Sequence, residues 1–259
     1  MNKITLLLCL MSLIVACSNN ELAEKGFPVN TNGTENTTDQ VEGIRSDTLS
    51  FATKPRNILL TKNAAHRLTP IFKVNFHPKT GKPFTGTVAT HRNYDRVGDQ
   101  LGNRWNDNFM PGFSAAYGYN FINLSHYDLK QQTTNLLFEN PVLIKTLYYP
   151  SFSNDTLNGT AIARNYYLVS CYDEDTNRDG YISLRDLRRF YYFDINGKEQ
   201  RALVPKNYAV MSSEYDSAND YMYVFAQLDE NENGQMEYEE PIHIFWIDLS
   251  APERVGRQY

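Results

Sequence analysis

The sequence predicts an all-β fold of antiparallel sheets, and three observations support this class. Runs of β-branched and aromatic residues recur along the chain, for example at 71–76 and 165–172. Clusters of Gly, Pro, Asn and Asp, which are typical of turns, separate these runs. The 259 residues include 18 Tyr and 14 Phe, which supply enough large side chains for a sizeable core.

The expected strands follow one another along the chain. Residues 71–76 and 83–89 predict the two arms of a hairpin around a turn at 78–81. Residues 92–112 predict a long loop, and 112–116 are also assigned to loop. Asn196-Gly197 favours a type I′ hairpin turn. Further strands are expected at 119–127, 143–149, 165–172, 190–193, 221–226 and 242–247.

The second half of the chain repeats itself. Asp229 follows Asp175 by 54 residues and Asp248 follows Asp194 by 54, so strand, polar loop and strand recur without a gap. Asp128 is a weaker echo of Asp194 and Asp248. Units of about 50 residues, each a small antiparallel sheet, predict a propeller-like repeat of about four blades over residues 51–259. These units resemble the blades of periplasmic propellers of the TolB and WD40 groups. A β-sandwich with long loops is the alternative.

Residues 175–186 place oxygen-bearing side chains at alternate positions of a short loop. Asp175, Asn177 and Asp179 occupy loop positions 1, 3 and 5, and Gly180 follows at position 6, where the chain must turn sharply. Asp186 brings a carboxylate to position 12. A hard cation such as Ca²⁺ collects six to eight oxygens, and this spacing offers them from one loop.

Residues 229–240 repeat this pattern with Gly234 at position 6, and both loops resemble the calcium-binding loop of the EF-hand family. The resemblance implies backbone carbonyl ligands at position 7 and a ligand at position 9. Two polar surface turns are the alternative interpretation. The ligands implied by position are Asp175, Asn177, Asp179, Tyr181, Ser183 and Asp186 in the first loop, and Asp229, Asn231, Asn233, Gln235, Glu237 and Glu240 in the second.

The calcium expected here is structural. The segments that enter both loops have the composition of strands, and Pro241 ends any helix directly after the second loop. A regulatory EF-hand needs two helices whose angle changes when calcium binds. The ion is therefore expected to neutralise crowded carboxylates and to fix the turn between two strands.

The N-terminus predicts export and lipid attachment. Residues 1–16 read as a signal peptide, with Lys3 before an apolar run, and residues 13–17 resemble the lipobox of bacterial lipoproteins. The resemblance implies lipid on Cys17, and Ser18 favours the outer membrane because inner-membrane retention signals carry Asp there. An ordinary signal peptide with an incidental Cys is the alternative. Residues 17–50 are mostly polar and predict a flexible tether.

Composition limits the function further. The formal net charge is −5 and no basic block is present, so nucleic acid is not an expected partner. Calcium, the membrane and an envelope protein or glycan are the expected partners of a binding module without enzymatic activity. The alternative is an envelope hydrolase acting on glycan or peptide through Asp95, Asp99 and Asp107. The binding module is preferred because no catalytic constellation is visible, and Cys171 is expected to be a buried thiol.

Overall fold

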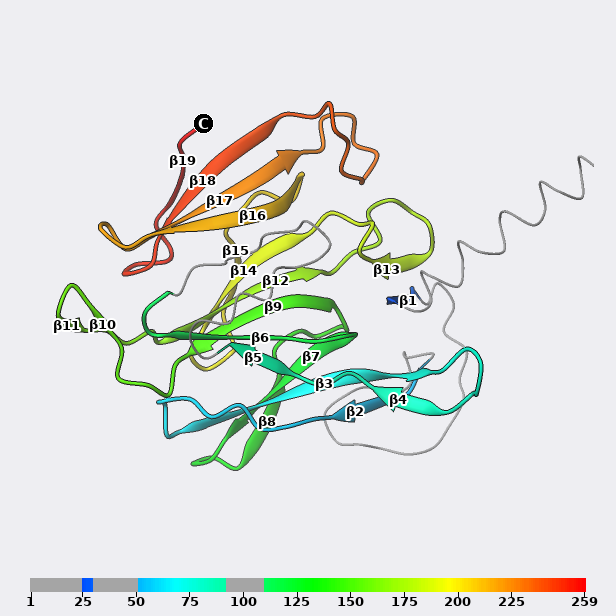
Figure 1. Cartoon of the computed structure of the whole chain (residues 1–259), viewed down its shortest axis with the longest axis horizontal. Coiled ribbons are helices and arrows are strands. Elements are labelled where there is room, and N and C mark those ends of the chain that lie inside the picture. The colour runs from blue at the N-terminus through cyan, green and yellow to red at the C-terminus, as the bar shows by residue number, and fades with distance from the viewer. Residues whose placement is uncertain (1–24, 30–50, 92–109) are drawn as a thin grey trace, which may run out of the picture.

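The computed structural model describes residues 25–29, 51–91 and 110–259 (Figure 1). All regular secondary structure within these ranges is β-strand, which confirms the all-β prediction. None of these residues belongs to a helix that is long and apolar enough to cross a membrane. The predicted signal peptide at 1–16, Cys17, most of the predicted tether and the acids Asp95, Asp99 and Asp107 lie outside the described residues.

The described residues form three large sheets, in which every strand pairing is antiparallel. The first has the order β2 (Thr53–Pro55), β3 (His66–Phe76), β7 (Phe121–Asp128) and β8 (Thr133–Leu136), with β4 (Pro83–Thr85) also on β3. The second has the order β15 (Gln200–Ala202), β14 (Arg189–Asp194), β12 (Tyr166–Tyr172), β9 (Leu143–Pro150), β6 (Phe113–Tyr117) and β5 (Ala89–His91). The third has the order β16 (Tyr208–Asp216), β17 (Tyr221–Leu228), β18 (Ile242–Asp248) and β19 (Val255–Arg257).

The six-stranded sheet lies between the other two, as Figure 1 shows. One apolar cluster, which includes Leu168 and Val224, fills the space toward the four-stranded sheet. A second, which includes Val169 and Phe72, fills the space toward the five-stranded sheet. Neighbouring residues of β12 thus enter opposite cores, because successive side chains of a strand point to opposite faces. This explains why all seven residues of β12 are buried and mostly apolar.

The number of sheets differs from the prediction of about four blades. The described residues give three large sheets, because β5, β6 and β9 join the sheet of β12 and β14 and form no blade of their own. The 54-residue repeat is confirmed in both units where it was found. The strand pairs β12–β14 and β17–β18 each enclose one of the predicted loops.

The Asp residues of the repeat have a common role. Asp128, Asp194 and Asp248 each end a strand, and each carboxylate accepts hydrogen bonds from backbone N–H groups of the turn that follows. One detail of these turns was predicted wrongly. A type I′ turn needs positive φ at both central residues, but between Asp194 and Gly197 only Gly197 has positive φ, at 68°. The carboxylate of Asp194 bonds the N–H groups of Lys198 and Glu199, which stabilises a longer turn.

Two segments assigned to tether or loop form strands. The loop assignment of 112–116 is wrong, because β6 pairs with β9 over residues 113–116. Within the predicted tether, β1 (Gly26–Pro28) pairs with β13 (Tyr181–Ser183). Phe27 explains this ordering, since its ring is buried among Ile182, Phe51 and other apolar residues. A further small hairpin pairs β10 (Thr156–Leu157) with β11 (Thr160–Ala161).

Candidate metal loops

The first loop, residues 175–186, connects β12 with β14 and winds around its own polar side chains. The carboxylate of Asp175 accepts hydrogen bonds from the N–H groups of Asp179 (3.0 Å) and Gly180 (2.9 Å). The side-chain oxygen of Asn177 accepts a bond from the N–H of Asp179 (3.0 Å). Asp179 in turn accepts one from the N–H of Tyr181 (3.0 Å). The side chains at positions 1, 3 and 5 therefore point into the loop.

The second loop, residues 229–240, has the same pattern at the same positions. Asp229 accepts hydrogen bonds from the N–H groups of Asn233 (3.1 Å) and Gly234 (3.0 Å). Asn231 accepts one from the N–H of Asn233 (2.9 Å), and Asn233 accepts one from the N–H of Gln235 (2.9 Å). The sequence repeat is thus also a repeat of local geometry.

The backbone follows the same course in both loops. Position 4 has positive φ in each, at 58° for both Arg178 and Glu232. Position 6 has positive φ as well, at 87° for Gly180 and 75° for Gly234. Glycine adopts this conformation without steric cost, which accounts for its presence at the turn.

The carboxylates at position 12 close the loops in equivalent ways. Asp186 accepts hydrogen bonds of 2.8 Å from the N–H groups of both Thr176 and Ser183. Glu240 accepts them from the N–H groups of Glu230 (3.0 Å) and Glu237 (3.3 Å). The shorter Asp at position 12 of the first loop therefore reaches the same two loop positions as the Glu of the second.

Burial sets the electrostatics of these acids. Asp186 is fully buried, and Asp229 and Glu240 are each 8% exposed. None of the ion pairs within the described part of the chain involves any of the three. Burial raises the pKa of Asp186 to about 6, a rise that hydrogen bonds from backbone N–H groups oppose and the nearby carboxylate of Asp175 reinforces.

The donor set fits a hard cation by chemistry, because every side-chain ligand predicted from the EF-hand resemblance offers oxygen. Across the residues that the structure describes, no group of three or more His, Cys, Asp and Glu side chains could hold a metal ion. In the second loop, the amide groups of Asn231 and Asn233 donate hydrogen bonds of 2.8 and 2.9 Å to Glu237. Calcium also binds amide and backbone carbonyl oxygens, and these are among the predicted ligands that are not carboxylates.

The two loops touch each other. The hydroxyl of Thr176 donates a hydrogen bond of 2.7 Å to the carbonyl oxygen of Gly234. The same hydroxyl accepts a bond of 2.9 Å from the N–H of Leu187, directly after position 12 of the first loop. A Cβ atom at Gly234 would lie 1.9 Å from the carbonyl oxygen of Thr176, so only glycine permits this approach. The sequence motif contains no signal for Thr176, because position 2 lies outside the ligand pattern.

The first loop also holds the N-terminal segment. β1 pairs with positions 7–9 of the loop, and the N–H of Val29 donates a hydrogen bond of 2.9 Å to the carbonyl of Gly180. The ammonium group of Lys73 donates one of 2.6 Å to the carbonyl of Gly26. The apolar run 26–29 within a polar stretch was the available signal for this contact.

The second loop presents a different surface. Its position 8, Met236, is 43% exposed, whereas the equivalent Ile182 is buried beneath β1. Tyr238 in the same loop is almost fully exposed. Cys171 in β12 belongs to the apolar cluster toward the five-stranded sheet and is fully buried as expected, and burial raises the pKa of its thiol well above the usual value.

Comparison with known proteins adds little. No protein-family model matches the chain, and no curated protein matches it. Among solved structures it is similar to a putative TolB from Agrobacterium tumefaciens, with 8% sequence identity over 81% of each chain and a TM-score of 0.28. A likeness at this TM-score carries no argument, so the all-β assignment rests on the sheets themselves.

Proposed function

We propose that the protein is a lipid-anchored module of the bacterial cell envelope, and that structural calcium in its two acidic loops stabilises it. One observation carries the calcium proposal. Two loops 54 residues apart fold around oxygen-bearing side chains with the same hydrogen bonds at the same positions. Lipid on Cys17 and location at the outer membrane belong to the proposal and rest on the sequence of residues 1–18.

The position of the loops favours a structural role for the ion. Each loop joins two adjacent antiparallel strands, and in the described residues no helix flanks either loop. Calcium would offset the repulsion among the carboxylates of each loop and hold each turn closed. Because β1 pairs with the first loop, the ion would also hold the N-terminal segment against the folded body.

The action proposed for the folded body is binding of an envelope protein or glycan. The alternative, a hydrolase, depends on Asp95, Asp99 and Asp107, which lie outside the described residues, so it remains a prediction. Outside the cytoplasm a site with a dissociation constant of about 10⁻⁴ to 10⁻³ M suffices for calcium binding. At a hundredfold excess of calcium over that constant, each site would stabilise the fold by about 2.7 kcal/mol.

Thermal unfolding with and without calcium tests the proposal. We expect chelation by EDTA to lower the Tm, and calcium, but not magnesium at equal concentration, to restore it. Asp175→Ala or Asp229→Ala should each remove part of the calcium-dependent gain. Asp216→Ala is the matched control, because Asp216 holds a turn between β16 and β17 outside both loops. It should lower the Tm equally in both conditions. A Tm that is unchanged by EDTA would contradict the calcium proposal.

A further inference from the structure

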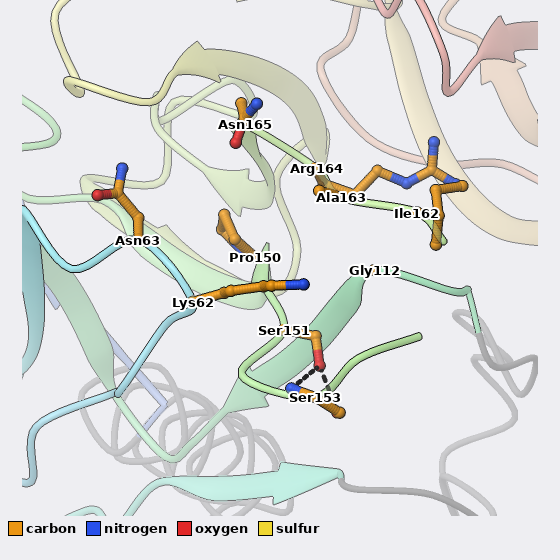
Figure 2. A pocket seen from close by; sticks show the side chains of 10 residues that line it. All are labelled: Lys62, Asn63, Gly112, Pro150, Ser151, Ser153, Ile162, Ala163, Arg164 and Asn165. Carbon is orange, nitrogen blue, oxygen red and sulfur yellow. Dashed lines mark hydrogen bonds between the residues drawn. The ribbon is translucent and has the colours of Figure 1, made fainter. Parts of the chain in front are cut away.

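A small cavity of about 240 Å³ opens where the six-stranded sheet meets the segment before β3. Its walls come from four stretches of the chain: residues 62–63, Gly112 directly before β6, residues 150–153 at the end of β9 and residues 162–165 before β12. Figure 2 shows the side chain of Lys62 extending across this cavity between Pro150 and Ser151. The cavity does not include any of the residues of the two acidic loops.

The charge of the cavity is positive. Its lining includes Lys62 and Arg164 but no acid, although the chain carries a net charge of −5. The guanidinium of Arg164 is already neutralised by Asp220, at 2.6 and 2.8 Å. Lys62 is exposed and forms no hydrogen bond or ion pair with any residue in the described ranges, so among these residues its ammonium is the charge that a ligand can reach.

The polar groups around Lys62 suit a ligand with hydroxyl groups. The hydroxyls of Ser151 and Ser153 are hydrogen-bonded to each other at 2.7 Å, and Asn63 and Asn165 are the other polar residues of the lining. Ile162 adds an apolar surface. Sugar-binding sites need such a combination, since a sugar ring has polar edges and an apolar face.

The walls are held in place before any ligand binds. The N–H of Gly112 donates a hydrogen bond of 2.9 Å to Asp155, and its carbonyl accepts one of 2.8 Å from the N–H of Ser151. Arg164 is buried and donates to the carbonyl oxygens of Pro111 and Leu249. Preorganised walls reduce the entropic cost of binding.

We propose that this cavity binds a single carboxylated sugar residue, with the carboxylate on Lys62 and the ring hydroxyls on the serine and asparagine side chains. The cavity is smaller than the roughly 300–1,000 Å³ of sites for drug-sized ligands, so one sugar unit is the appropriate size. This inference rests on the proposed function as an envelope binding module and specifies its ligand class as an acidic glycan.

Calorimetric titration of the full chain with glucuronate and galacturonate tests the proposal. Glucose and galactose are the neutral counterparts and test whether the carboxylate is needed. Glycine and a short peptide test whether a carboxylate without a sugar ring binds as well. We expect a uronate to bind with millimolar or better affinity, and its neutral counterpart to bind at least about tenfold more weakly. Uronate binding should weaken as salt concentration rises.

Substitutions assign the binding to the cavity. Lys62→Met should weaken uronate binding about tenfold or more and leave neutral sugars unaffected, whereas Lys62→Arg should retain most of the affinity. Lys79→Met is the control, because Lys79 is exposed in the turn between β3 and β4. Equal binding of uronate and neutral sugar, no uronate binding at all, tighter binding of glycine or peptide, or an unchanged affinity in Lys62→Met would each overturn the proposal. The Tm experiment with EDTA is independent of these titrations, so failure of the calcium proposal would be recognised separately.

Discussion

The hydroxyl of Thr176 lies 2.7 Å from the carbonyl oxygen of Gly234, and this hydrogen bond joins the two acidic loops. The first loop belongs to the six-stranded sheet and the second to the four-stranded sheet, so the contact also links two layers of the fold. The N–H of Thr176 bonds Asp186, which closes the first loop. A disturbance at Gly234 is therefore expected to reach the first loop through Thr176.

Alanine substitution at the two equivalent glycines separates this contact from backbone strain. Gly180 and Gly234 both have positive φ, so either change to alanine should cost about 1 kcal/mol of stability. A Cβ atom at Gly180 meets nothing within 4 Å, whereas at Gly234 it would overlap the carbonyl of Thr176. We expect Gly234→Ala to cost a further 1–3 kcal/mol or so, as overpacking does. Urea unfolding in calcium measures both, and equal losses would show that the loop contact does not affect stability.

The features that the sequence predicted are those encoded within a short stretch. Asp175, Asn177 and Gly180 determine the path of their loop through hydrogen bonds to N–H groups at most five residues away. β12 was also predictable, because a strand with two buried faces is a nearly continuous apolar run. The 54-residue spacing of Asp194 and Asp248 indicated the repeat, because each Asp ends a strand and bonds N–H groups of the turn that directly follows it.

The features that were missed depend on partners far away along the chain. Phe27 is buried against Ile182, which is 155 residues away, and the apolar run 26–29 indicates burial of this segment but not its partner. β6 contains Ser114 and two alanines, which have weak strand preference. This segment forms a strand because it pairs with β9. The Asn-Gly turn is the exception, because its prediction failed for a local reason: the carboxylate of Asp194 bonds the N–H groups of Lys198 and Glu199, which stabilises a longer turn.

The docking of β1 on the first loop is testable by limited proteolysis. Phe27→Ser removes a buried aromatic side chain worth about 2 kcal/mol. We expect trypsin to cut after the exposed Lys25 at least about tenfold faster, because the segment detaches more often. If calcium holds the first loop, EDTA should increase cleavage of the wild-type protein in the same way. Val29→Ser, at an exposed position, should change the rate little, and a rate unaffected by Phe27→Ser would contradict docking through this ring.

A buried ion pair holds together the ends of several strands. Arg164 pairs with Asp220 at 2.6 Å and also donates to the carbonyl of Leu249 in the four-stranded layer. Asp220→Asn keeps the side-chain shape and tolerates the positive φ of this position, but leaves the buried guanidinium without its counter-charge. We expect a loss of about 3–5 kcal/mol in the free energy of unfolding. Glu199→Gln in the exposed pair with Arg201 should cost less than about 1 kcal/mol, and similar losses for both variants would refute this assignment.

The buried histidine pair predicts a pH dependence of stability. The rings of His126 and His66 lie 4.4 Å apart, and Nε2 of His126 lies 3.0 Å from the carbonyl of Ile195, so this nitrogen carries the proton in the neutral ring. Its Nδ1 is buried and has no hydrogen-bond partner within the described residues. A second proton would therefore be unsatisfied. Burial lowers the pKa of His126, and His66 lowers it further, while the carbonyl of Ile195 acts in the opposite direction.

The unfolded state then binds more protons at His126 than the native state does, so stability rises with pH between the lowered pKa and the unfolded value of about 6.5. The contribution of His126 is retained above pH 6.5 or so and falls as the solution becomes more acidic, by at most about 1.4 kcal/mol per pH unit. Urea unfolding from pH 7.5 to 5, with EDTA present so that calcium binding does not contribute, would measure the slope. His126→Gln should flatten it, because glutamine can still donate to Ile195 and does not titrate. His77→Gln, in the exposed turn after β3, should leave the slope unchanged. If His126→Gln has the same slope as the wild type, the acid sensitivity originates elsewhere in the fold.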